Sequence, residues 1–244
     1  MRLIIDIGNS RTKLAVFSSE NLIYLDIQKE ISIDILKNLF QRFTSINMSI
    51  ISCVGISRES LSPIIDFISK NSKLIEMNSN LSFGINIKYE TPNSLGVDRI
   101  AGVIGAKSLF PNENILVIDA GSCITYDFID KNNIYLGGGI SPGFLMKFRA
   151  LNNFTANLPL ITHVDNSPYL GKSTHESILS GVIHGTLFEI KGFIDYYKSQ
   201  VSGLKIILSG GDGDFIYKNI KEEILLEENL VLYGLNIILE SNAK

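Results

Sequence analysis

A carboxylate, a glycine and several polar residues follow an apolar stretch close to the N-terminus. Residues 3–5 are apolar, and Asp6 and Gly8 come directly after them. A carboxylate at the end of a strand can hold Mg²⁺, either directly or through water. Glycine lets the backbone approach a ligand closely, so that amide groups of the turn can donate to phosphate oxygens. These residue types predict a site for a nucleotide phosphate and its metal ion.

The rest of this turn supplies further groups that suit an anion. Asn9 and Ser10 can donate hydrogen bonds to phosphate oxygens, and Arg11 and Lys13 bring positive charge. Strand alternation points the side chains of Arg11 and Lys13 to one face, where at least one of them can simply be solvated. The alternative interpretation is a plain β-hairpin, because Gly-Asn-Ser turns are common.

The same pattern occurs a second time 113 residues later. With this constant offset five positions are identical, so that Leu3, Ile5, Asp6, Gly8 and Thr12 correspond to Leu116, Ile118, Asp119, Gly121 and Thr125. Two copies of strand, carboxylate, glycine turn and returning strand predict duplicated halves that face each other over a cleft. Chance similarity between short apolar strands is the alternative.

A third segment, residues 89–99, carries an acid and a base next to each other. Pro92 and Gly96 mark an irregular loop, and residues 97–106 have a helical pattern, so Asp98 and Arg99 lie in the first turn of that helix. There Asp98 can accept a proton from an attacking hydroxyl while Arg99 steadies anionic oxygens. Alternatively, Asp98 only complements the helix dipole and Arg99 is a surface partner.

Two glycine-rich segments, residues 137–143 and 210–211, each follow a predicted strand. Glycine at such positions suits close approach of the backbone to a ligand or to a partner strand. The second segment, residues 210–211, is expected to lie below the adenosine of a bound nucleotide. Neither signal is specific, because loops of α/β proteins are often rich in glycine.

Residues 166–174 nearly spell a phosphate-binding P-loop. However, Asn166 replaces the first glycine, Pro168 removes an amide, and residues 158–164 would have to form the preceding strand. The better interpretation makes Ser173 the N-cap of a long helix, with Glu176 three residues later as in a capping box. Thr174 can still contact a substrate.

Strands and helices alternate along the chain, which predicts an α/β fold with helices covering the sheet faces. We expect strands over the first 26 residues, among them residues 3–7 and 12–17, and further strands at residues 48–54, 74–77, 114–119 and 204–208. Helices are expected at residues 31–43, 61–68, 97–106, 174–197 and 229–239, and directly after residue 143. The repeat divides the chain into residues 1–113, with the phosphate turn and the segment 89–99, and residues 114–244, with the second turn and the adenosine side.

Composition restricts the classes of function. Of the 244 residues, 45% are hydrophobic and 19% charged, as in ordinary globular proteins, and the net charge of −3 gives no reason to expect nucleic acid as a partner. The longest apolar runs are too short for a membrane span or a signal peptide. Two distant cysteines, Cys53 and Cys123, predict neither a disulfide framework nor a zinc site. We therefore expect a cytoplasmic protein.

Four ordered motifs together resemble the type III pantothenate kinase family, within the superfamily of actin, hexokinase and heat-shock chaperone ATPases. They are DIGNSRTK at residues 6–13, LGVDR at 95–99, DAGS at 119–122 and GGISPG at 138–143. The resemblance runs from Leu3 to about Leu235. It implies duplicated actin-like (ribonuclease H-like) halves, with mixed sheets flanked by helices and an ATP cleft between the halves.

The resemblance also implies ATP-dependent phosphorylation of pantothenate to 4′-phosphopantothenate, the first step of coenzyme A biosynthesis. Asp98 would be the general base. ATP, with Mg²⁺ on Asp6, would be bound by Asp6, Ile7, Gly8, Asn9, Ser10, Arg11, Thr12, Lys13 and Ser122. Pantothenate would be held by Tyr89, Gly96, Val97, Asp98, Arg99 and Thr174. Asp119 would bind a monovalent cation, K⁺ or NH₄⁺, and the enzyme would be a homodimer.

Two departures from the family pattern concern the pocket. Ser122 stands where the family usually has threonine, which keeps the hydroxyl, and Thr91 stands where asparagine is common. Alternative functions are a non-catalytic ATP-binding regulator on the same fold, or a kinase for another small hydroxyl or acid substrate.

Overall fold

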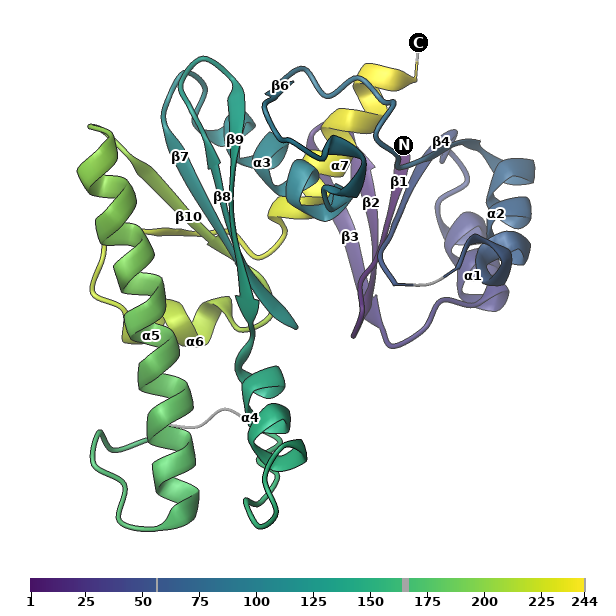
Figure 1. Cartoon of the computed structure of the whole chain (residues 1–244). Coiled ribbons are helices and arrows are strands. Elements are labelled where there is room, and N and C mark those ends of the chain that lie inside the picture. Colours follow the sequence, from purple (N-terminus) through teal and green to yellow (C-terminus); the bar gives the residue numbers. More distant parts are fainter. Residues whose placement is uncertain (56, 164–166, 244) are drawn as a thin grey trace. The chain divides into compact units, whose positions relative to one another are not determined.

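The chain forms two compact units in the computed structural model, which describes residues 1–55, 57–163 and 167–243 (Figure 1). The first unit comprises Met1–Pro111, Asn133–Tyr135 and Asn229–Lys244, and the second comprises Asn112–Asn132 and Leu136–Glu228. Each unit is built around its own sheet and its own hydrophobic core.

Within the described ranges, the first unit holds a five-stranded sheet of order β3-β2-β1-β4-β5. Strand β1 is antiparallel to β2 and parallel to β4, and β5 is parallel to β4. The crossovers after β3 and β4 each contain one helix. The elements in chain order are β1 (Arg2–Ile7), β2 (Thr12–Ser18), β3 (Asn21–Gln28), α1 (Ile33–Arg42), β4 (Met48–Cys53), α2 (Arg58–Asn71) and β5 (Lys73–Glu76).

Within the described ranges, the second sheet has six strands in the order β11-β10-β7-β8-β9-β6, and five of them, β9-β8-β7-β10-β11, repeat this arrangement. Strand β7 is antiparallel to β8 and parallel to β10, and β11 is parallel to β10. Its elements are β7 (Ile115–Ala120), β8 (Cys123–Ile129), β9 (Ile134–Pro142), α4 (Phe144–Asn153), α5 (Thr174–Gln200), β10 (Lys205–Ser209), α6 (Gly213–Asn219) and β11 (Leu225–Leu226). The first two residues of β9 also pair with β6 (Asn86–Ile87).

The equal strand orders confirm the predicted duplication. In both sheets the first strand in sequence lies between its hairpin partner and the strand that follows the crossover helix. The predicted fold class, two repeated α/β halves with mixed sheets flanked by helices, is therefore correct. Chance similarity of short strands does not explain five strands with the same order in both sheets.

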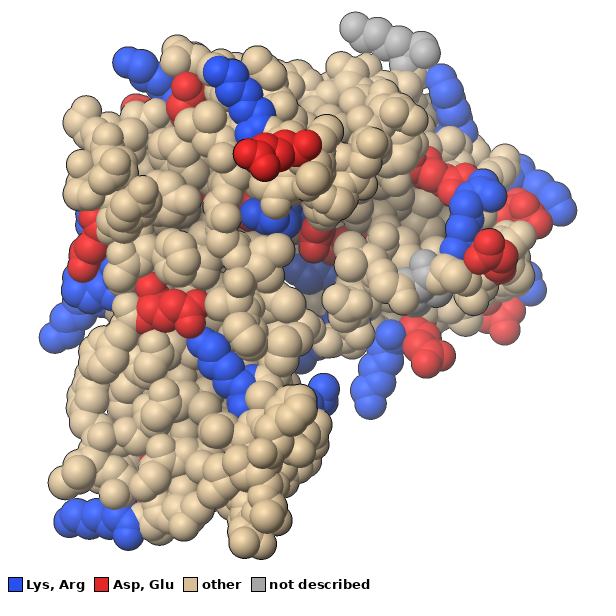
Figure 2. All heavy atoms as spheres, in the orientation of Figure 1, with Lys and Arg blue, Asp and Glu red and all other residues tan. Residues whose placement is uncertain are grey.

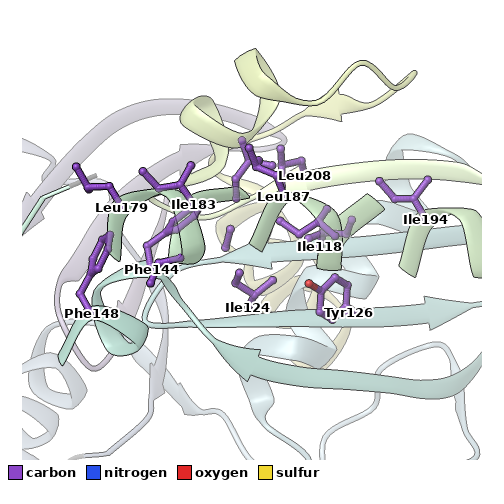
Figure 3. Packing of buried hydrophobic residues seen from close by; sticks show 14 of the residues in the cluster. Ile118, Ile124, Tyr126, Phe144, Phe148, Leu179, Ile183, Leu187, Ile194 and Leu208 are labelled. Atoms are coloured by element: carbon purple, nitrogen blue, oxygen red, sulfur yellow. The ribbon is translucent and has the colours of Figure 1, made fainter. Parts of the chain in front are cut away.

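Both faces of the two first strands are covered, which explains their unbroken apolar sequences. Residues 3–5 of β1 and residues 115–118 of β7 are almost completely buried. A strand that is packed on both faces needs apolar side chains at every position rather than at alternate ones. Figure 3 shows the resulting core of the second unit, in which Ile118, Tyr126 and Phe144 lie with residues of α5 such as Leu187.

Two helices outside this repeat pack closely in the first unit, α3 (Val97–Leu109) and α7 (Leu230–Asn242). A Cβ atom on Gly234 would lie 1.8 Å from the carbonyl oxygen of Ala101, and one on Gly105 would lie 2.4 Å from that of Leu230. Glycine at both positions therefore allows the two backbones to touch. Because of this packing, α7 groups with the first unit, whereas the sequence analysis assigned residues 229–244 to the C-terminal half.

Other sequence expectations also needed revision. Residues 137–142, expected as a glycine loop, belong to strand β9, because a Cβ on Gly138 would lie only 1.5 Å from the carbonyl oxygen of Tyr126 on β8. Residues 158–163 form no strand, and Val164 lies outside the described residues. The short elements β6, α6 and β11, together with the 3-10 helix η1 (Pro92–Ser94), were not predicted.

Candidate active site

The first polar turn connects β1 to β2 and is held by one backbone hydrogen bond. The Gly8 N–H donates to the carbonyl of Arg11 at 3.0 Å. Asn9, Ser10 and Arg11 are exposed, so a ligand can reach the surface of the turn. The turn therefore has the open, amide-rich form that the sequence predicts for phosphate binding.

Two predicted ligand residues of this segment face inward instead. Ile7 and Thr12 pair with each other across the β1–β2 ladder, and their side chains are 1% and 2% exposed. Only their backbone groups can contribute to a site on the surface of the turn.

The end of β4 supports the same turn from beside β1. The Val54 N–H donates to the carbonyl of Ile7 at 2.9 Å, which extends the parallel pairing beyond the strand. Next to it, Gly55 has a φ of +86°, and a Cβ there would lie 2.4 Å from Oδ1 of Asn9. Gly55 thus leaves room for the Asn9 side chain. Sequence reasoning missed this residue, although a glycine just beyond a predicted strand was a usable signal.

Asp6 is the penultimate residue of β1 and lies between Lys13 on β2 and Ser52 on β4. Burial raises the pKa of the Asp6 carboxyl to about 6; the Lys13 ammonium lowers this pKa, the negative charge of Asp98 raises it, and the Ser52 hydroxyl lowers it. A carboxylate that is expensive to ionise in the free protein gains from a bound cation. The surroundings of Asp6 therefore fit Mg²⁺.

Asp98 and Arg99 begin helix α3, as predicted, and Asp98 is close enough to Asp6 for their charges to interact. The Arg99 N–H donates to Oδ1 of Asp98 at 2.9 Å, which fixes the carboxylate at the helix start. Gly96 precedes them, and a Cβ on it would lie 2.5 Å from the same oxygen. Only 8% of Arg99 is exposed, so its interpretation as a surface partner is wrong.

Tyr89, a predicted substrate contact, lies ahead of this helix in the first unit. It is half-buried, and its ring packs at 6.1 Å, centroid to centroid, from that of Tyr135. The 3-10 helix η1 lies between Tyr89 and α3, and in it the Ser94 hydroxyl donates to the Thr91 carbonyl at 2.9 Å. Thr91, the position that departs from the family pattern, thus caps this turn.

The second polar turn joins β7 to β8 and is shorter than the first. Asp119 pairs with Thr125 on β8 and with Ser209 on β10. The Gly121 N–H donates to the Cys123 carbonyl at 2.9 Å, which leaves Ser122 exposed at the tip.

Two glycines from other segments pack against this second turn. A Cβ on Gly143 would lie 2.1 Å from the carbonyl oxygen of Gly121, and the Gly143 N–H donates to the Ser122 carbonyl at 3.0 Å. Gly210, with a φ of +92°, approaches Ala120 so closely that its Cβ would lie 2.3 Å from the Ala120 carbonyl oxygen. Both glycine-rich segments of the sequence therefore serve, at least in part, to build this turn.

The start of α5 agrees with the predicted helix cap. The Ser173 hydroxyl accepts from the Glu176 N–H at 3.2 Å, and the Glu176 carboxylate accepts from the Lys172 N–H at 2.7 Å. Thr174 is exposed in the first turn. Because residues 158–163 form no strand, the P-loop interpretation lacks the strand that it requires; its first residue, Asn166, lies outside the described residues.

The two units divide the predicted site residues between them. The first unit holds residues 6–13, Tyr89 and residues 96–99, and it brings Asp6, Lys13, Ser52 and Asp98 into one neighbourhood. The second holds Asp119, Ser122 and Thr174. Among the residues that the structure describes, three or more histidine, cysteine or acidic side chains nowhere gather as a metal cluster. In these same ranges, the helices lack the length and apolar character needed to cross a membrane.

Comparison with known proteins agrees with this fold and these turns. A model of the type III pantothenate kinase family matches residues 2–196. A type III pantothenate kinase of Christiangramia forsetii is 40% identical over 243 residues, which cover 99% of this chain and 99% of that protein.

Solved structures show the same fold at lower identity. A Campylobacter jejuni protein described as a Baf family transcriptional activator has a TM-score of 0.61 at 24% identity, with 99% of this chain and 98% of that one covered. A Listeria monocytogenes protein described as an N-acetylmannosamine kinase has a TM-score of 0.59 at 12% identity, with 100% and 99% covered.

Two repeated sheets, each with a carboxylate and a glycine turn after its first strand, define the fold class of this chain, a duplicated actin-like α/β fold. Within this class, the chain belongs to the type III pantothenate kinase family. Kinases of this family use ATP together with a divalent metal ion.

The raised pKa of Asp6 predicts that this residue destabilises the free protein at neutral pH. The folded state holds the Asp6 proton more tightly than the unfolded state does, so protonation of Asp6 stabilises the fold. This stabilisation is complete below pH 3.8 and is lost as the pH rises through about 6. Asp6→Asn cannot ionise. It should raise the free energy of unfolding at pH 7.5 by on the order of 1–3 kcal/mol, with the gain vanishing towards pH 4.

Denaturant unfolding without nucleotide or Mg²⁺, at pH 4.5, 6 and 7.5, measures this difference. Asp214→Asn, at an exposed position paired with Lys218, is the matched control and should show no such pH-dependent gain. An Asp6→Asn protein that is equally or less stable than the wild type at pH 7.5 would show that the carboxylate is well solvated or compensated.

Proposed function

We propose that this chain transfers the γ-phosphoryl group of ATP to the hydroxyl of pantothenate, forming 4′-phosphopantothenate in the first step of coenzyme A biosynthesis. The observation that carries the proposal is the full-length similarity to a type III pantothenate kinase, together with the Asp6 and Asp98 carboxylates in one neighbourhood. We place the reaction in the cytoplasm, because it draws on the cellular ATP pool; cell fractionation tests this location.

Asp98 is the proposed general base. Its position in the first turn of α3 orients the carboxylate, and the bond from the Arg99 N–H leaves the second carboxylate oxygen to accept a proton. In phosphoryl transfer, alignment and charge stabilisation supply most of the catalysis, and the base removes the hydroxyl proton. Asp98 thus receives the proton of the pantothenate hydroxyl as the oxygen attacks phosphorus.

The nucleotide phosphates are proposed to bind the first turn, at residues 6–13, with Ser122 as a contact from the second turn. The exposed amides and side chains of residues 9–11 would donate to phosphate oxygens, and Lys13 would add positive charge. Asp6 would hold Mg²⁺, which supplies charge neutralisation for the transferred phosphoryl group. The close contact of Gly55 with Asn9 supports this assignment, because it orients a donor at the tip of the turn.

Pantothenate is proposed to contact Tyr89, residues 96–99 and Thr174. Arg99 is the natural partner for the carboxylate of pantothenate or for a phosphate oxygen, because guanidinium forms two parallel hydrogen bonds to such groups. Gly96 and Val97 would contribute backbone contacts next to the base, and the Thr174 hydroxyl would add a polar contact. Tyr89 would provide an apolar wall with a polar tip.

A monovalent cation, K⁺ or NH₄⁺, is proposed to bind near Asp119. The carboxylate ends a buried strand beside the hydroxyl-bearing residues Thr125 and Ser209, and carbonyl oxygens of the adjacent turn can complete an oxygen-rich site. Such a cation would add positive charge near the phosphates in a site that lacks the lysine of a P-loop.

Phosphate transfer to pantothenate, measured by coupled ADP release in K⁺ and again in Na⁺, tests both substrate and cation. We expect turnover with pantothenate that is strongly stimulated by K⁺, and none with a panel of sugars, acetate and polyphosphate. Absence of transfer to pantothenate in both salts would favour a non-catalytic regulator and overturn the proposal. Equal rates in K⁺ and Na⁺ would show that the reaction needs no specific monovalent cation.

Asp98→Asn should lower turnover by at least about a hundredfold while leaving ATP binding nearly unchanged, because a general base contributes on the order of 10²–10⁴ in rate. Steady-state kinetics and calorimetric ATP titration measure the two effects separately. Asp34→Asn is the matched control, since Asp34 also lies in the first turn of a helix but is exposed on α1. Near-normal turnover in Asp98→Asn would remove Asp98 from this role.

The chain is also proposed to be a homodimer. Large apolar side chains are exposed on α4, on α5 and on the segment between them, including Phe154 (88%), Leu170 (76%), Tyr169 (74%) and Phe188 (62%). Figure 2 shows few charged side chains over this part of the second unit. Exposed apolar surface of this kind marks a protein interface, and a second copy is the occupant that the family resemblance implies.

Sedimentation velocity over a range of concentrations should give a dimer for the wild type. Phe188→Glu would place a charge in the apolar surface and should shift the protein towards monomer. Tyr217→Glu is the control, because Tyr217 is an exposed aromatic residue on α6. A wild-type protein that remains monomeric at all concentrations would overturn the dimer.

A further inference from the structure

A half-buried ionic network in the second unit joins four elements through one carboxylate. Glu189 on α5 accepts from the Lys147 ammonium of α4 at 2.8 Å and from the Tyr126 hydroxyl of β8 at 2.9 Å. It also accepts from the Ser141 hydroxyl at the end of β9. Lys147 donates in addition to the Thr186 hydroxyl of α5, at 2.9 Å. No residue of this network belongs to the sites described above.

Two partners of Glu189 in this network, Ser141 and Lys147, lie on either side of Gly143 in the chain. Ser141 comes two residues before Gly143, at the end of β9, and Lys147 comes four residues after it, in the first turns of α4. The Lys147 N–H also donates to the Gly143 carbonyl at 3.0 Å. One carboxylate on α5 therefore fixes the chain both before and after this glycine.

Gly143 in turn determines the shape of the second polar turn. Its N–H donates to the Ser122 carbonyl at 3.0 Å, and its Cα is so close to the turn that an added Cβ would lie 2.1 Å from the Gly121 carbonyl oxygen. A small displacement of Gly143 therefore either breaks this hydrogen bond or pushes the turn. Figure 3 shows the neighbouring Phe144 in the core that α5 covers, so α5 is the fixed support on which the segment rests.

We propose that Glu189 is a positioning residue for nucleotide binding: by holding Ser141 and Lys147 it fixes Gly143, and through Gly143 it holds Ser122 in its binding geometry. This inference rests on the proposed role of Ser122 in contacting the nucleotide. It assigns no contact between Glu189 and the substrate.

The charge of Glu189 is needed for this role as well as its shape. Partial burial would raise the pKa of the Glu189 carboxyl, but hydrogen bonds from Lys147, Ser141 and Tyr126 outweigh this effect and lower it. The side chains of Lys147 and Glu189 are only 21% and 27% exposed, so water compensates poorly when one partner is removed. A glutamine at position 189 could still accept from one hydroxyl, but its amide N–H groups would face the ammonium.

Glu189→Gln should weaken MgATP binding about tenfold, the loss that corresponds to one charge-assisted hydrogen bond, while the KM for pantothenate stays within about twofold. Calorimetric titration of MgATP measures the first quantity without any turnover, and steady-state kinetics measure the second. Glu222→Gln is the matched control, because Glu222 is also a partly buried carboxylate that pairs with lysines of α5, Lys191 and Lys198, away from Gly143 in the chain. Its affinity for MgATP should remain that of the wild type.

Two further variants separate positioning from general destabilisation. Ser141→Ala removes a single hydroxyl from a folded core; it should weaken MgATP binding, and the loss in Ser141→Ala/Glu189→Gln should be smaller than the sum of the two single losses. Lys147→Arg should retain most of the affinity, whereas Lys147→Met should lose it. These variants also keep the proposal testable if Glu189→Gln folds poorly.

The inference is overturned if Glu189→Gln and Ser141→Ala bind MgATP as tightly as the wild type, or if they lower only the melting temperature or the KM values of both substrates equally. The result of this test does not depend on whether the proposed reaction is correct. A wild type that binds MgATP but does not phosphorylate pantothenate would refute the reaction, and the affinities of the variants would still decide the role of Glu189.

Discussion

The desolvated carboxylate of Asp6 is the constraint around which the first unit is arranged. It ends a strand that is buried on both faces, between a lysine on one neighbouring strand and a hydroxyl on the other. Burial and the nearby Asp98 make ionisation costly, so the free protein holds a charge that it does not fully compensate. Binding of the proposed Mg²⁺ would relieve this cost and would couple the stability of the fold to occupancy of the site.

Duplication explains why the second unit offers a similar but different turn. The same strand order brings Asp119 to the position that Asp6 occupies in the first sheet, yet the second turn is shorter and is supported by Gly143 and Gly210. In the first unit, Gly55 has the corresponding supporting role beside Asn9. Each turn is therefore shaped from outside, by a glycine of a later segment.

Sequence reasoning succeeded where the signal was local. The unbroken apolar runs of β1 and β7 and the Ser173 cap each depend on residues that are close in the chain, and the five identities compare two short segments of this kind. From these the repeated α/β fold and the two polar turns follow, because burial on both faces and helix capping are decided by neighbouring residues.

The parts that sequence reasoning missed depend on contacts between distant segments. The glycines at 137–139 resemble a loop, but they belong to a strand because β8 passes within van der Waals distance. Helix α7 joins the first unit because Gly234 meets Ala101, more than a hundred residues earlier. Likewise, the interaction of Glu189 with Ser141 and Lys147 leaves no pattern in the sequence, since the three residues lie on different elements.

The central proposal is that residues of the first turn and Ser122 of the second turn contact one nucleotide. Calorimetric titration of MgATP into the wild type, into a protein with Asn9→Ala in the first turn, and into one with Ser122→Gly in the second, tests it most directly. We expect one nucleotide per chain and weaker binding in the same single transition when either turn is changed. Two separate binding events, each sensitive to only one of the turns, or an affinity that Ser122→Gly leaves unchanged, would contradict it.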